Sequence, residues 1–287
     1  MVWISNHQYA AAKRAGVLAP FAKFPGLVSR MLSALAAGRS AGRSNSGGGG
    51  GGRADSEADV AVAAIALQRL AATVFQHLEG VAQRDPKYCH VVRLENYYFF
   101  SQSVGPQGAK CLENAVAQAD AAFETATAAY LQWLASYQFP YLTQFFARIE
   151  DLVARCGAAD VAFHENKKSL EAVLRKHGQE ATIVEGLRAT HARLVKHISR
   201  ESGLLALLWD RLSDTLFAMF SRYEELCTVC YGHAMAPGAS DVRRLASDVG
   251  GGGGGYDGAA SENMASNRSD AEEMSATTSP RSVGSMS

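Results

Sequence analysis

The sequence has no excess of charge of either sign. Lys and Arg together number 28, as do Asp and Glu, so the formal net charge at pH 7 is zero. A balanced chain has no overall attraction to nucleic-acid phosphates or to an anionic membrane surface. We therefore expect no nucleic-acid partner, and any contact with an anionic surface has to come from a local patch of basic residues.

Cysteine is also scarce. The five cysteines, Cys89, Cys111, Cys156, Cys227 and Cys230, are odd in number and mostly far apart. Secreted disulfide frameworks use an even number of cysteines in a short chain, so this pattern indicates reduced thiols. The sequence also lacks a basic and then apolar leader at its start, and any uninterrupted apolar run of bilayer-spanning length. These absences together predict a cytoplasmic protein.

Motifs of catalysis and cofactor binding are missing. There is no Gly-x-Ser-x-Gly elbow, Walker loop or Rossmann glycine fingerprint. His164-Glu165 is followed at the required spacing by Lys168 rather than by a second histidine, so the zinc-protease motif is absent. Cys227-x-x-Cys230 has no second pair of ligands and lies in an apolar helical stripe, where we expect both thiols to be core residues. We therefore expect no cofactor, no metal and no small-molecule substrate.

Long apolar stripes of helical period dominate the rest of the chain. In three segments, apolar residues recur at alternating spacings of four and three, the pattern of a helix face packed against neighbours. No segment sustains the period of two that a strand requires. The stripes are Val60, Ala64, Leu67, Ala71, Val74, Leu78 and Val81; Leu112, Val116, Ala119, Phe123, Ala126, Tyr130, Trp133 and Tyr137; and Leu205, Leu208, Leu212, Leu216, Met219, Tyr223, Leu226 and Cys230.

The connections between the helical segments are short, so successive helices should run antiparallel. The length of the stripes favours elongated bundles over a globin-like cluster. We therefore predict an all-α fold, an elongated rod of stacked antiparallel helical bundles. Shorter helices are predicted at Pro140–Arg155, Lys167–His177 and Glu180–Ser199, with Asp85 and Asn166 as N-caps and Gly178 and Gly232 as helix ends.

Two low-complexity segments set the predicted domain boundaries. Each contains a six-glycine tract among small and polar residues. Such segments bury too little apolar surface to offset the entropy lost on ordering them. We expect a helical segment at 1–37, a disordered insert at 38–56, a helical-bundle body at 57–231 and a disordered tail at 232–287.

Glu95 and Asn96 are polar residues inside an apolar helix. We interpret them as hydrogen-bond partners of buried backbone or of a tyrosine hydroxyl. The alternative is an acid–base site within the aromatic residues around them. Aromatic residues at helical spacing are usually core, and a partner-facing surface is the second alternative because Tyr and Trp are favoured interface anchors. The cluster comprises Tyr97, Tyr98, Phe99, Phe100, Tyr130, Trp133, Tyr137, Phe139 and Tyr141.

Basic residues gather on two successive predicted helices between residues 167 and 200. Charged helix faces are usually only solvated, but a hairpin of these helices would form a candidate surface for anionic lipid or an acidic partner. Glu171, Glu180 and Glu185 are interleaved, so we expect weak, salt-sensitive binding at most. The candidate residues are Lys167, Lys168, Arg175, Lys176, Arg193 and Lys196.

Several stretches resemble, in order, the motifs of one family. Asp85-Pro-Lys-Tyr88 leads into Leu94-Glu-Asn-Tyr97, as in the Sec-three family of exocyst components. The run from Gly16 to Pro25 is similar to that family's Gly-Val-Leu-x-Pro-Phe-x-x-Phe-Pro segment. The order and spacing of the motifs make the resemblance specific over roughly residues 3–231. Further likenesses are Tyr137-Gln-Phe139, Ile149-Glu-Asp-Leu152 and Leu205-x-x-Leu-Trp-Asp210.

The resemblance implies a non-enzymatic exocyst subunit that tethers secretory vesicles to the plasma membrane before fusion. Its expected partners are the other exocyst subunits, with weak peripheral contact with anionic membrane at exocytic sites. Family members begin with a phosphoinositide- and GTPase-binding domain and a coiled coil; this sequence contains neither, so we expect a C-terminal fragment or a truncated sequence. The alternatives are a helical adaptor outside the exocyst and an enzyme with a site near Glu95.

Overall fold

The computed structural model describes residues 16–44, 52–198 and 203–251. Every regular element within these ranges is a helix, so the prediction of an all-α fold is confirmed. The α-helices are α2 (Ala19–Ser44), α3 (Gly52–Arg84), α4 (Cys89–Val104), α5 (Glu113–Gln138), α6 (Pro140–Cys156), α7 (Val161–His164), α8 (Lys167–His177), α9 (Glu180–His197), α10 (Leu204–Tyr231) and α11 (Ala239–Gly251), with 3-10 turns η1 (Gly105–Gln107), η2 (Lys110–Leu112) and η3 (Ala158–Asp160).

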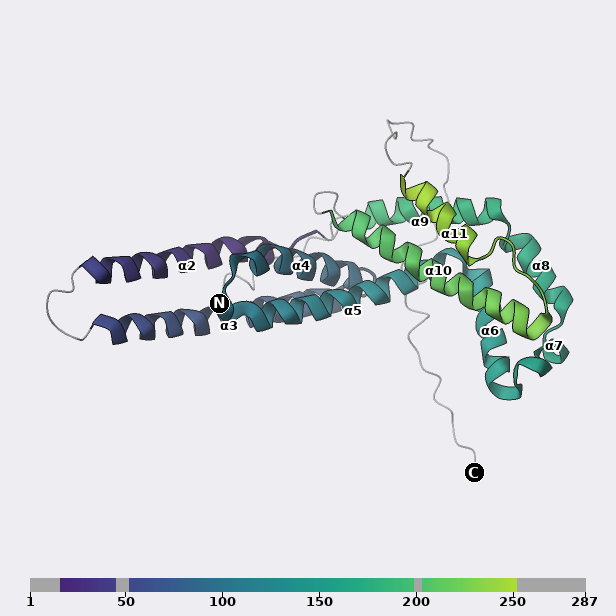
Figure 1. Cartoon of the computed structure of the whole chain (residues 1–287), viewed down its shortest axis with the longest axis horizontal. Coiled ribbons are helices and arrows are strands. Elements are labelled where there is room, and N and C mark those ends of the chain that lie inside the picture. The colour runs from purple at the N-terminus through teal and green to yellow at the C-terminus, as the bar shows by residue number, and fades with distance from the viewer. Residues whose placement is uncertain (1–15, 45–51, 199–202, 252–287) are drawn as a thin grey trace, which may run out of the picture.

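Helices α2 to α5 lie side by side at one end of an elongated molecule (Figure 1). The short helix α4 is the centre of this bundle and packs against α2, α3 and α5. Its buried residues Val91, Val92, Leu94 and Phe100 point in several directions around the helix. An apolar surface on more than one face is what a helix with neighbours on several sides requires.

Helix α5 continues beyond this bundle and joins it to a second group of helices (Figure 1). The chain turns at Phe139, and Pro140 takes the first position of α6, where its missing N–H costs no hydrogen bond. Helices α5, α6, α9 and α11 all pack against α10. Leu212 and Leu216, in the middle of the predicted stripe of α10, are buried in this core.

One stretch of α3, Ala58–Arg84, is long and apolar enough to span a membrane by length and composition alone, with a mean hydropathy of 1.5. Leu67, Val74 and Leu78 in this stretch are buried in the α2–α5 bundle, while Val62 nearer its start is exposed. A buried core helix has the same composition as a membrane-spanning helix. Burial against neighbouring helices therefore accounts for the apolar residues of α3 from Leu67 onward, whereas Val62 and Ile65 before it are exposed.

Three predicted helix boundaries are confirmed, among them Gly178 at the end of α8, and one is wrong. The Asn166 side chain accepts a hydrogen bond from the Ser169 amide (3.0 Å) and caps α8, as predicted. Gly232 ends α10 in the left-handed conformation that favours glycine. Asp85 does not cap α4, because the chain first makes a turn in which the Tyr88 amide donates to the Asp85 carbonyl. Pro86 suits the second position of that turn, between α3 and α4.

Helix α11 corrects the predicted C-terminal tail. The expected disorder from residue 232 is wrong for residues 239–251, where Val242, Leu245 and Ala246 are buried against α9 and α10. The Trp209 indole donates to the Ala246 carbonyl at 3.2 Å. The spacing of the three buried residues is that of an amphipathic helix, a signal that the abundant Gly, Ser and Asp of the region concealed. Residues 232–238 link α10 to α11, with Met235 buried, and residues 252–287 lie outside the described part.

The predicted disorder at 38–56 is wrong for residues 38–44 and 52–56. Helix α2 runs to Ser44 and α3 begins at Gly52, so both ends of the insert are helical, and residues 45–51 lie outside the described part. Once a helix has formed, each added residue gains a hydrogen bond at little further cost. Composition alone therefore did not show that the flanking helices extend into the predicted insert.

Candidate interaction surfaces

Glu95 and Asn96 attach the start of α2 to α4. The Gly16 amide donates to the Glu95 carboxylate and the Leu18 amide donates to the Asn96 side-chain oxygen, both at 2.7 Å. The Asn96 amide group donates to the Gly16 carbonyl (3.2 Å) and to the Val92 carbonyl of its own helix (2.8 Å). Gly16 has a φ of +63°, which favours glycine. We call Gly16, Leu18, Glu95 and Asn96 the α2–α4 joint.

The joint decides between the two interpretations of Glu95. The Glu95 side chain is 2 % exposed and bonded to buried backbone, as the structural interpretation predicted. Behind the joint, the Phe21 ring packs edge-on against Tyr97 and Phe100. The Gly16–Pro25 and Asp85–Phe100 motifs, about 80 residues apart in sequence, therefore form one structural unit.

A second polar cluster ties α3 to α4. Glu79 accepts two hydrogen bonds from the Arg93 guanidinium, at 2.9 and 2.7 Å, and one from the Tyr97 hydroxyl at 2.9 Å. Burial, and then the Glu79 carboxylate, raise the pKa of Tyr97. The hydroxyl therefore stays protonated as a donor, and the cluster acts as a structural clamp between two helices.

The aromatic cluster divides into core and surface residues. Tyr130 is buried, and its hydroxyl lies 3.0 Å from Nδ1 of His197 at the end of α9. Trp133 and Tyr137 continue along α5 and are half-buried, with the Arg193 guanidinium 4.2 Å from the centre of the Tyr137 ring. Tyr141 on α6 is 61 % exposed. The cluster is thus core at one end and surface at the other.

The Cys227-x-x-Cys230 pair is part of the core, as predicted. Both side chains are buried in α10, and burial raises the pKa of the Cys227 thiol to about 12. We expect Cys227 to resist alkylation by iodoacetamide at pH 8 in the folded chain, because the reactive species is the thiolate. Peptide mapping by mass spectrometry should show labelling of the half-buried Cys111 first. Equal labelling of Cys227 and Cys111 without denaturant would contradict this assignment.

The structure splits the predicted basic patch between two surroundings. Helix α8 packs against α6, whereas α9 packs against α5 and α11. The short link at Gly178 and Gln179 therefore does not produce the side-by-side hairpin that we expected. The four α8 cations are exposed, Arg193 lies over Tyr137, and Lys196 is exposed on α9. The candidate residues are Lys167, Lys168, Arg175, Lys176, Arg193 and Lys196.

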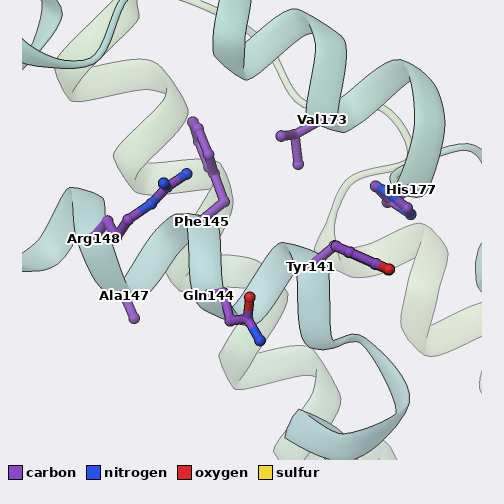
Figure 2. Close-up of a pocket in the computed structure, with 7 residues that line it drawn as sticks. All are labelled: Tyr141, Gln144, Phe145, Ala147, Arg148, Val173 and His177. Atoms are coloured by element: carbon purple, nitrogen blue, oxygen red, sulfur yellow. The ribbon is translucent and has the colours of Figure 1, made fainter.

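A groove between α6 and α8, which the sequence did not predict, is lined by side chains of both helices (Figure 2). The Tyr141 ring stacks on the His177 imidazole, with centroids 4.2 Å apart and ring planes 15° apart. The Arg148 guanidinium lies 5.6 Å from the centre of the buried Phe145 ring. The hollow has a volume of about 490 Å³ and is lined by Tyr141, Gln144, Phe145, Ala147, Arg148, Val173 and His177.

The chain matches the family model described as "Exocyst complex component Sec3, C-terminal" over residues 1–233. The match covers most of the chain and includes every helix from α2 to α10. This chain belongs to the Sec-three family of exocyst components. Membership confirms the resemblance found in the sequence motifs, and the matched region ends before α11.

Curated relatives of the Sec-three family come from distant organisms. Exocyst complex component SEC3A of Arabidopsis thaliana is 27 % identical over 190 residues, 64 % of this chain and 21 % of the relative. Exocyst complex component 1 of Dictyostelium discoideum is 21 % identical over 187 residues, 63 % of this chain and 21 % of the relative. The chain therefore spans about one fifth of the length of these relatives. No solved structure matches it significantly.

Proposed function

We propose that this chain acts as a non-enzymatic subunit of the exocyst, tethering secretory vesicles to the plasma membrane before fusion. The observation that carries the proposal is the family match over residues 1–233. The proposed partners are the other exocyst subunits, and the proposed site of action is the cytoplasmic face of the plasma membrane at exocytic sites.

The geometry of Glu95 supports a role without catalysis. A general acid or base has to reach the substrate that it protonates or deprotonates. The Glu95 carboxylate is covered and holds the Gly16 amide, so it supports the α2–α4 joint instead. An adaptor outside the exocyst has the same helical fold, and only a cellular experiment separates the two roles.

The cellular test is depletion of the chain and measurement of secretion. In cells that express it, depletion is expected to slow the release of a secreted reporter and to increase the number of vesicles near the plasma membrane. Re-expression of the wild-type chain should restore both. Normal secretion and normal vesicle numbers after complete depletion would favour the adaptor.

We further propose a weak contact with anionic membrane through the exposed α8 cations. Each basic residue near an anionic surface contributes about 1 kcal/mol, and salt screens this attraction. The purified chain should float with phosphatidylserine vesicles at low salt and dissociate at high salt. Reversing the charge of Lys167, Lys168, Arg175 and Lys176 should abolish flotation.

A matched control reverses four exposed cations in the α2–α5 bundle and its adjoining turn, so that the net charge changes equally. This control is expected to retain more binding than the α8 variant. If both variants lost flotation equally, the binding would depend on net charge alone, and α8 would not be the membrane contact. Tight binding that survives high salt would also contradict the proposal. The control residues are Arg30, Arg69, Arg84 and Lys110.

A further inference from the structure

The outer face of α6 has the pattern of a helix-packing surface. Its groove-lining residues Tyr141, Gln144, Phe145 and Arg148 follow the i, i+3, i+4, i+7 spacing of residues that face a neighbouring helix. Tyr141 remains 61 % exposed and the Arg148 side chain 65 % exposed. Phe145 between them is buried and Tyr141 stacks on His177, so α8 covers part of this stripe and leaves the ring of Tyr141 and the guanidinium of Arg148 open.

Another stripe of α6 already faces the body of the protein. Leu142, Phe146 and Ile149 are buried, and the Phe146 ring stacks on Tyr223 of α10 with centroids 4.1 Å apart. The groove-lining stripe is thus a second surface of α6, which α8 covers only in part. Across the groove, α8 supplies Val173 and His177 (Figure 2).

The length of the groove along α6 matches that of a short helical segment. Tyr141 and Arg148 are seven residues apart, which is about 10 Å or two helical turns. The floor is apolar, because Phe145 is buried and Val173 is half-buried. Two turns of a partner helix would therefore place one or two apolar side chains over this floor.

The positive charge at the groove favours a partner with acidic side chains. None of its seven lining residues is acidic, and Arg148 and His177 lie at its two ends. The ion pair between Arg148 and Glu165 is long, at 3.8 Å, and exposed, so it holds the guanidinium weakly. Arg148 therefore has N–H donors for a second carboxylate. Lys176 adds positive charge beside His177.

We propose that the groove between α6 and α8 binds an acidic amphipathic helix of a partner protein. Apolar anchors of that helix pack on Val173 and the exposed Tyr141 ring, and its flanking carboxylates accept hydrogen bonds from Arg148. A flat membrane surface fits less well, because the apolar floor lies between two helices. This proposal rests on the groove itself and does not depend on the proposed role in tethering.

The test uses the purified full chain and a fluorescent synthetic helix. The probe has leucine anchors at i, i+3 and i+7 and glutamate at the flanking positions, and a matched peptide has glutamine in place of each glutamate. Fluorescence anisotropy is expected to show about tenfold tighter binding of the glutamate peptide, an advantage that decreases with salt. Equal binding of the two peptides, or no binding of either, would overturn the proposal.

Variants on α6 locate the binding site. Arg148→Glu is expected to lower the affinity for the glutamate peptide about tenfold. Gln144→Glu should also lower this affinity. Arg155→Glu is the matched control, because Arg155 is also on α6 and its side chain is equally exposed at 65 %. It should change affinity less than about twofold, since it lies outside the groove lining.

Circular dichroism verifies that each variant is folded. An Arg148→Glu variant that is folded and binds as tightly as wild type would overturn the proposal. It would also be overturned if the chain bound neither peptide but bound phosphatidylserine vesicles, and if Arg148→Glu abolished that binding. Failure of the peptide test leaves the secretion test unaffected, so the two proposals fail separately.

Discussion

Replacing Leu212 with alanine is expected to lower the free energy of unfolding by about 2–5 kcal/mol. Leu212 is fully buried in the middle of α10, the helix against which α5, α6, α9 and α11 pack. The substitution removes buried apolar surface and leaves a cavity that rigid neighbouring helices fill only in part. Leu216→Ala, one turn further along, should have an effect in the same range because Leu216 is also buried.

Chemical denaturation followed by circular dichroism measures this loss. Val229→Ala is the matched control, because it shortens an apolar side chain on the same helix that is 59 % exposed. The control should change the free energy of unfolding by less than about 0.5 kcal/mol. If Leu212→Ala and Val229→Ala unfold at the same denaturant concentration, α10 is not the core helix described above.

The second large effect is expected from Asn96→Ala in the α2–α4 joint. The substitution leaves the Leu18 amide and the Gly16 carbonyl without their Asn96 partner. Each buried polar group that loses its partner costs about 1–3 kcal/mol, so we expect a total loss of roughly 2–4 kcal/mol. Because the lost hydrogen bonds hold the start of α2, we expect this segment to open locally, in addition to the loss of overall stability.

Hydrogen exchange measured by mass spectrometry tests the local effect. Amides of residues 16–28 should exchange faster in Asn96→Ala than in wild type, while those of α10 change less. Ser29→Ala is the control, because it removes an exposed hydrogen bond from α2 to Gln107 of η1. Unchanged exchange at residues 16–28 in Asn96→Ala would mean that the joint does not hold α2.

The sequence predicted those parts of the fold that depend on local pattern. The stripe through Leu212 gave the position and buried face of α10, and Asn166 gave the start of α8. The period of a helix and the chemistry of a cap are both set by residues close together in the chain. The same argument gave the core position of Cys227.

Contacts between segments far apart in the chain could not be predicted from local sequence patterns. Glu95 and Asn96 were expected to satisfy buried backbone, but their partners Gly16 and Leu18 are about 80 residues away. Periodicity shows which face of a helix is buried and does not show against which segment. Both halves of the joint were visible as motifs, yet only the structure shows that they meet.

The angle between α8 and α9 was missed for a similar reason. A two-residue link favours a hairpin, but α9 packs against α5 at a point where Gly186 approaches the Phe139 ring. A Cβ atom at Gly186 would lie only 2.6 Å from that ring. This close approach fixes the direction of α9, and no local signal in the α8–α9 link reports it.

The measurement that tests the central claim most directly is isolation of the tagged chain, expressed at its natural level, followed by quantitative mass spectrometry. If the chain is an exocyst subunit, the other exocyst subunits should co-purify in near-equal amounts and remain bound through high-salt washes. A folded chain that is recovered alone, or with other proteins and without exocyst subunits, would contradict the account.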